Sequence, residues 1–158
     1  MSIDAPYLRQ TLLEAASTSD IDTILETLES GASIDGLIDS VDDESGFTAL
    51  HHACVHGYLD LTCFLLRHGA MANIHDKFRK SPLHYACHFG HTEVVYILLD
   101  SGRVDVDELY RMNEAKLTCL QTAASKGHTA ILRLLLLHGD IIDGVNEVLL
   151  APLSCLHS

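Results

Sequence analysis

Short apolar stripes recur along the chain and alternate with polar positions. In segments 50–54 and 83–87 the first, fourth and fifth residues are apolar, which is the spacing of one face of a helix. A longer and more apolar run follows at 61–66, at 94–99 and at 131–137. This pattern predicts pairs of helices, with a short first helix and a more hydrophobic second helix in each pair.

A four-residue phrase opens each predicted pair. It is Thr48-Ala49-Leu50-His51 in one copy and Ser81-Pro82-Leu83-His84 in the next, 33 residues later, and a weaker copy is Thr118-Cys119-Leu120-Gln121. Thr and Ser are favoured N-cap residues, because the hydroxyl accepts a hydrogen bond from an unpaired backbone N–H. Self-similarity at this period indicates one supersecondary unit reused, and such units bury their apolar faces by stacking.

Glycines divide each unit in the same way. One glycine falls about ten residues after the opening phrase, where a tight turn between antiparallel helices favours positive φ; these are Gly57, Gly90 and Gly127. Another is expected to end the second helix; these are Gly69, Gly102 and Gly139. Each unit is therefore predicted as helix, glycine turn, helix, glycine and extended connection.

These motifs resemble the ankyrin repeat. The third unit is the best match, with Ser81-Pro82-Leu83-His84, Gly90-His91, Glu93-Val94-Val95, Leu98-Leu99 and Gly102. The resemblance implies an all-α solenoid of helix-turn-helix units with extended hairpin loops. It also implies that His51 and His84 are structural hydrogen-bonding residues.

The whole chain, residues 1–158, is predicted to be one repeat domain. Its expected units are a degenerate cap at 5–34, then 45–75, 78–106 and 115–142, and a truncated fifth unit at 148–158. The closing glycines lie 38 residues apart from Gly31 to Gly69, 33 to Gly102 and 37 to Gly139. We expect the extra residues in the connections 35–45 and 104–116, as lengthened hairpin tips or lids.

Charge and composition narrow the function. The net charge of −12 argues against generic nucleic-acid binding. Eleven of the 22 acidic residues precede Phe47, against one basic residue, Arg9. This is either a solvated end unit or a patch that attracts a basic partner. No apolar run approaches ~20 residues and no signal peptide is recognised, so membrane insertion is not expected. Five cysteines, three of them at core positions, indicate reduced thiols in a cytoplasmic or nuclear protein.

Eleven histidines raise the alternative of a metal-binding sensor. The closest sequence cluster is His84, Cys87, His88 and His91. The repeat register works against convergence, because Cys87 falls on the core face and His91 begins the next helix. We therefore predict no metal site and no cofactor. The sequence also lacks recognisable hydrolase, metalloprotease and phosphate-binding motifs, which predicts a protein that is not an enzyme.

In ankyrin repeats, partner contacts concentrate just before the opening phrase and just before the turn glycine. Transferred to this chain, the candidate partner-binding residues are Glu44, Phe47, His56, Lys77, Phe78, Lys80, His88, Phe89, Leu117 and Lys126. Phe47, Phe78 and Phe89 fall at positions expected to be exposed, which predicts an aromatic groove for an apolar or mixed segment of a partner. The alternative, that a long neighbouring loop covers them, stays open.

The predicted function is a non-catalytic protein–protein interaction module, such as a scaffold, adaptor or inhibitor. Its partner is expected to be another protein that is basic or carries an apolar segment, and the module is expected to be monomeric. A second alternative is that the chain is the N-terminal fragment of a larger protein. Asn73 matches a family position whose asparagine can be hydroxylated, although most such residues bond the hairpin backbone.

Overall fold

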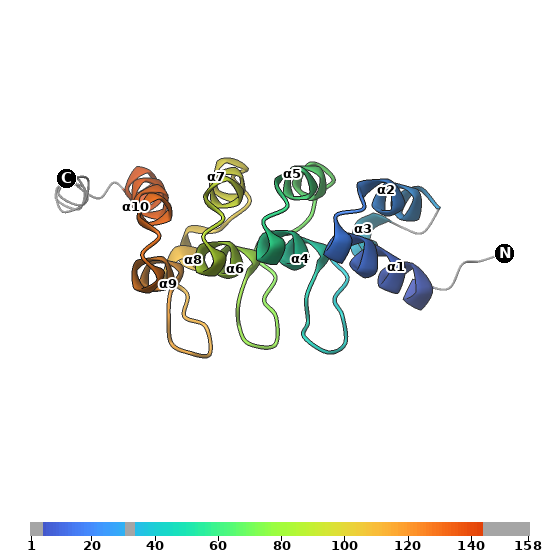
Figure 1. The fold of residues 1–158 in the computed structure, drawn as a ribbon, viewed down its shortest axis with the longest axis horizontal. Helices are drawn as coiled ribbons and strands as arrows, with labels where there is room; N and C mark the ends of the chain where they lie inside the picture. The colour runs from blue at the N-terminus through green and yellow to red at the C-terminus, as the bar shows by residue number, and fades with distance from the viewer. Residues whose placement is uncertain (1–4, 31–33, 144–158) are drawn as a thin grey trace.

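The computed structural model describes residues 5–30 and 34–143, and in these ranges it is an all-helical stack without strands (Figure 1). The predicted fold class is confirmed. The predicted fifth unit at 148–158 and Cys155 lie outside the described residues.

The helices form two rows (Figure 1). The inner row, next to the long loops, contains α1 (Ala5–Thr18), α4 (Ala49–His56), α6 (Pro82–Phe89) and α9 (Cys119–Lys126). The outer row contains α2 (Ile21–Glu29), α5 (Leu59–Arg67), α7 (Thr92–Asp100) and α10 (Thr129–Asp143). The main inner-row contacts join α1 to α4, α4 to α6 and α6 to α9, so each unit packs chiefly on its neighbours.

The core runs between the two rows. Leucines at the same place in successive inner helices, Leu50 and Leu83, are 1% and 0% exposed. Ala53, Ala86 and Ala123 are fully buried at matching positions, and their small side chains let adjacent inner helices approach closely. Burial at these repeated places explains why neither row is stable without the other.

The opening phrases cap the inner helices. Thr48, Ser81 and Thr118 are N-cap residues, and each forms a capping box with the residue three positions later. The turn glycines adopt the left-handed conformation, with φ of 73° at Gly57 and 77° at Gly90. At Gly57 an added Cβ would also lie only 2.5 Å from the His91 ring, so a larger residue is excluded twice over.

Three long loops project from the inner row, away from the outer row (Figure 1). We name them finger 1 (residues 39–48), finger 2 (73–81) and finger 3 (111–118). Each is closed by a backbone hydrogen bond across its base: Asp42 N–H to Phe47 O, Asp76 N–H to Lys80 O and Asn113 N–H to Leu117 O, at 2.9 to 3.1 Å. Neighbouring tips are joined by Lys77 N–H to Ser45 O at 3.0 Å and Glu114 N–H to Phe78 O at 3.1 Å.

The prediction of lengthened hairpin tips or lids is wrong for most of the extra residues. The first connection contains the short helix α3 (Ile34–Leu37), and the second contains α8 (Val106–Tyr110). Both precede the fingers, and α8 packs against α9 and α10. The added chain therefore folds against the stack instead of extending the finger tips.

Gly139 does not end its helix as expected, because α10 continues through it to Asp143. The position is buried, and an added Cβ would lie 3.0 Å from the Tyr110 hydroxyl oxygen. Close approach of α8 to α10 therefore explains this glycine. Gly69 and Gly102, in contrast, adopt positive φ of 90° and 67° after α5 and α7.

Candidate protein-binding surface

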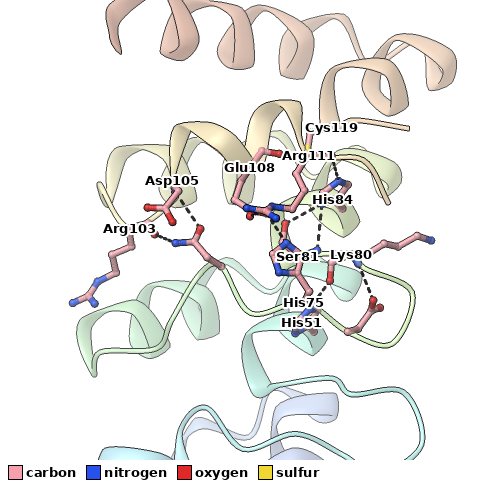
Figure 2. A network of polar contacts seen from close by, with 12 residues as sticks. His51, His75, Lys80, Ser81, His84, Arg103, Asp105, Glu108, Arg111 and Cys119 are labelled. Carbon is pink, nitrogen blue, oxygen red and sulfur yellow. Dashed lines mark hydrogen bonds and ion pairs between the residues drawn. The ribbon is translucent and has the colours of Figure 1, made fainter. Parts of the chain in front are cut away.

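The histidines of the opening phrases tie each finger to the unit before it (Figure 2). The Nδ1 atom of His51 accepts the backbone N–H of Thr48 at 3.1 Å, so the proton lies on Nε2, which donates to the Lys80 carbonyl at 3.1 Å. His51 is fully buried, and this burial lowers its pKa to about 4. The imidazole is therefore neutral and holds finger 2 in place.

His84 repeats this arrangement one unit later (Figure 2). Its Nδ1 atom accepts the Ser81 N–H at 3.2 Å, and Nε2 donates to the Arg111 carbonyl at 3.1 Å, where finger 3 begins. In the last described unit Gln121 replaces the histidine, and its Oε1 atom accepts the Thr118 N–H at 3.0 Å. The cap is kept there, and the link to a following finger is not printed for any described residue.

Finger 2 is shaped by a buried carboxylate. Asp76 is 6% exposed, and its Oδ1 atom accepts the backbone N–H groups of Phe78 and Lys80, both at 2.8 Å. Its Oδ2 atom accepts the Tyr85 hydroxyl at 2.6 Å, and the Lys80 ammonium lies 5.1 Å from the Tyr85 ring centroid. Phe78 and Lys80 thus project from a loop whose backbone is fixed.

A second buried carboxylate holds the insertion that contains α8 (Figure 2). The side chain of Glu108 is 1% exposed; its Oε2 atom lies 3.0 Å from His75 Nε2, and its Oε1 atom accepts Arg111 Nε at 2.8 Å. Asn73 adds a polar bridge, because it donates to the Arg103 carbonyl at 3.0 Å and accepts the Asp105 N–H at 3.1 Å. Finger 3 therefore starts from a clamped base.

Most of the predicted partner-binding residues face solvent. Phe78 and Phe89 are each 49% exposed and Leu117 is 37% exposed. The side chains of Lys80 and His88 are half-buried. The other exposed members of the predicted set are Glu44, His56, Lys77 and Lys126.

Phe47 corrects the prediction of a single aromatic groove. It is half-buried, and its ring stacks on His51 at 5.2 Å between centroids and meets the Tyr85 ring edge-on at 5.1 Å. The ring contacts of Phe89 go instead to His88 and His91. Phe47 therefore belongs to the packing at the base of the fingers, and Phe78 and Phe89 are the exposed aromatic residues of the predicted set.

Two hollows flank the inner row. One, of about 330 Å³, brings together residues of α6, α9 and fingers 2 and 3, including the predicted residues Lys80, His88, Leu117 and Lys126. We call it the finger 2–3 pocket. The other, of about 870 Å³, lies between α1 and finger 1 and is lined by residues that include Tyr7, Arg9, Glu14, Asp43, Glu44 and His52. We call it the N-terminal groove.

The described residues contain no group of three or more His, Cys, Asp or Glu side chains that could hold a metal ion. His84 is bonded to backbone atoms, and Cys87 is fully buried. No helix in the described part of the chain is long and apolar enough to cross a bilayer.

Comparison with known proteins settles the family. Two models described as ankyrin repeats match the chain, one of three copies over residues 61–146 and one of many copies over residues 12–66. The chain belongs to the ankyrin repeat family. A curated relative, the probable palmitoyltransferase AKR2 of Saccharomyces uvarum, is 35% identical over 71 residues, which is 45% of this chain and 9% of the relative. This ankyrin repeat chain therefore spans less than a tenth of that relative's length.

Sequence reasoning missed the buried residues that position this surface. Asp42, Asp76 and Asn113 occupy the same place in the three fingers, and in each finger the side chain accepts backbone N–H groups. An Asp or Asn five or six residues before each opening phrase was the available signal. Glu108 had no comparable signal, because its partners come from another unit.

Proposed function

We propose that this ankyrin repeat chain is a non-catalytic protein-binding module, of the scaffold, adaptor or inhibitor type. Its partner lies along the finger tips and the exposed face of the inner helices. The observation that supports this most directly is the exposure of Phe78 and Phe89, each 49%, on backbone held by hydrogen bonds between units. Exposed aromatic side chains on rigid elements are typical anchors of protein interfaces.

The partner is expected to place an apolar segment against Phe78 and Phe89. A basic part of the same partner would lie in the N-terminal groove, where Glu14, Asp43 and Glu44 outnumber Arg9. Arg9 already pairs with Asp43 at 2.9 Å. This arrangement needs no bound cofactor and no reacting group.

Affinity capture from cell extract followed by mass spectrometry tests the proposal. Phe78→Ala combined with Phe89→Ala should weaken retention of specific partners at least tenfold, since each anchor contributes roughly 1–3 kcal/mol. Tyr96→Ala is the matched control, because Tyr96 is 52% exposed on α7 of the outer row. Equal retention by both variants would contradict the proposed surface. Melting temperatures should stay close to that of the wild type.

A further inference from the structure

The finger surface has a charge opposite to that of the whole chain. The chain carries a net charge of −12, yet five of its ten Lys and Arg residues lie on fingers 2 and 3 and at the end of α9: Lys77, Arg79, Lys80, Lys116 and Lys126. The acidic residues of the same two fingers are Asp76, which is buried and hydrogen-bonded, and Glu114 at a tip. The surface left to solvent between these fingers is therefore cationic.

Two of these cations occupy backbone positions that favour glycine. Gly46 in finger 1 has φ of 78°, and the matching residues, two before the opening phrase, are Arg79 in finger 2 and Lys116 in finger 3, both with φ of 58°. A side chain in the left-handed region costs about 1 kcal/mol relative to glycine. Positive charge thus stands at the finger tips despite a conformational cost.

The finger 2–3 pocket concentrates this charge. Lys80 from finger 2, His88 from α6 and Lys126 from α9 all line it, and no carboxylate is among its lining residues. Partial burial, together with Lys126 and Lys80, lowers the pKa of His88, as expected where two ammonium groups face one imidazole. The two lysines therefore meet no compensating charge from the walls of the pocket.

A buried hydroxyl group also lines this pocket. Thr122 is 5% exposed, and its Oγ1 atom has no hydrogen-bond partner among the described residues. A buried polar atom without a partner is uncommon in a folded protein, because it loses its hydration without replacement. Ser125 and Asn113 line the same hollow, so polar groups of three kinds converge on it.

We propose that the finger 2–3 pocket binds an Asp or Glu carboxylate of an extended acidic segment of the protein partner. This inference rests on the proposed function and names the chemistry of that partner. The carboxylate accepts hydrogen bonds from Lys80 and Lys126, and Leu117 at the rim contacts an apolar neighbour of the acidic residue. A volume of about 330 Å³ is ample for one carboxylate side chain and its water.

The proposal also sets the direction of the bound segment. The N-terminal groove is rich in carboxylates, whereas the finger 2–3 pocket is rich in ammonium groups. A partner segment that crosses the fingers therefore lies with its acidic part on finger 3 and its basic part on finger 1. Reversing the segment would place like charges opposite each other at both ends, which disfavours that orientation.

Chemical-shift mapping by NMR with two defined peptides tests this inference. The probes are capped Gly-Glu-Leu-Glu-Gly and capped Gly-Lys-Leu-Lys-Gly, which differ only in charge. The acidic peptide should shift the amide signals of Lys80, Ser125 and Lys126 in a saturable manner. Lys126→Gln should weaken its binding at least threefold, whereas Arg67→Gln, which removes the same charge from exposed α5, should leave it unchanged.

The outcomes separate this inference from the proposed function. Equal binding of both peptides at the pocket, full affinity in Lys126→Gln, or no shift up to about 10 mM acidic peptide would overturn it. Partners still captured through Phe78 and Phe89 would then leave the binding module intact and refute only the acidic chemistry. Acidic-peptide binding, with capture independent of both phenylalanines, would instead overturn the proposed surface.

Discussion

At the scale of single residues, the buried imidazole of His51 does two jobs through its two nitrogens. One nitrogen caps its own helix at Thr48, and the other reaches the Lys80 carbonyl on the next finger. Gln121 shows what remains when a side chain can only cap. The resemblance predicted a structural histidine, and the geometry gives the reason for a ring: an amide is too short to serve both neighbours in this way.

Replacing His51 should separate these two jobs. His51→Ala should lower the free energy of unfolding by about 2–4 kcal/mol, because it leaves buried partners unsatisfied. His51→Gln should recover about 1 kcal/mol of that loss by keeping the cap. Urea denaturation measures both, and Gln121→Ala, at an exposed position, is the control that should cost less than about 1 kcal/mol. Equal losses for the two His51 variants would contradict this division.

Acid should weaken the folded state through the same residue. The folded-state pKa of His51 is about 4, below its ordinary value near 6.5, so the unfolded chain binds the proton more readily. The stability that neutral His51 contributes is therefore complete above about pH 6.5 and is lost as pH falls toward 4, by up to about 1.4 kcal/mol per pH unit. Denaturation curves from pH 7 to 4.5 should show this slope, and His51→Gln should reduce it.

At the scale of elements, the fingers are built on one plan with different residues. Partial burial opposes ionisation of Asp42, yet hydrogen bonds from Ser45, Phe47 and Glu44 outweigh it and lower the pKa of Asp42 to about 2. Gly46 then takes the left-handed position at the tip, where an added Cβ would lie 3.3 Å from the Lys77 nitrogen. Finger 1 is thus the tightest of the three.

Exchanging residues at the tip position should change stability in opposite directions. Lys116→Gly should raise the free energy of unfolding by about 0.5–1 kcal/mol, because it removes a side chain from positive φ. Gly46→Ala should lower it by about 1–2 kcal/mol, since it adds both backbone strain and contact with finger 2. Thermal melts of the two variants provide the measurement. A destabilised Lys116→Gly would mean that the lysine side chain holds the tip.

The insertion around α8 should depend on Glu108. Glu108→Ala leaves His75 and Arg111 without their shared carboxylate, so we expect a loss of about 2–4 kcal/mol. Hydrogen exchange should accelerate first in residues 106–113. Asp107→Ala, an exposed neighbour on the same helix, should have little effect. Equal protection in both variants would show that packing of α8 against α9 is sufficient.

At the scale of the whole molecule, the period of the sequence predicted the paired helices, their N-caps and their turn glycines, because these depend on residues close in sequence. It did not predict α3, α8 or the continuation of α10 through Gly139, since those depend on contacts with other units. The finger 2–3 pocket was missed for the same reason: Lys80, His88 and Lys126 come together only after three segments have stacked.

Each central inner helix also hides a thiol group. Cys54 and Cys87 are fully buried, and burial raises the pKa of Cys54, so neither reacts while its unit is closed. Alkylation by iodoacetamide followed by mass spectrometry should therefore modify the partly exposed Cys63 of α5 first, and modify the inner-row cysteines only as fast as their units open. The order of modification would then give the order in which the stack comes apart. An acidic peptide seated over α6 and α9 should slow the reaction of Cys87 and Cys119 more than that of Cys54, which would let native thiols act as a footprint of the bound partner.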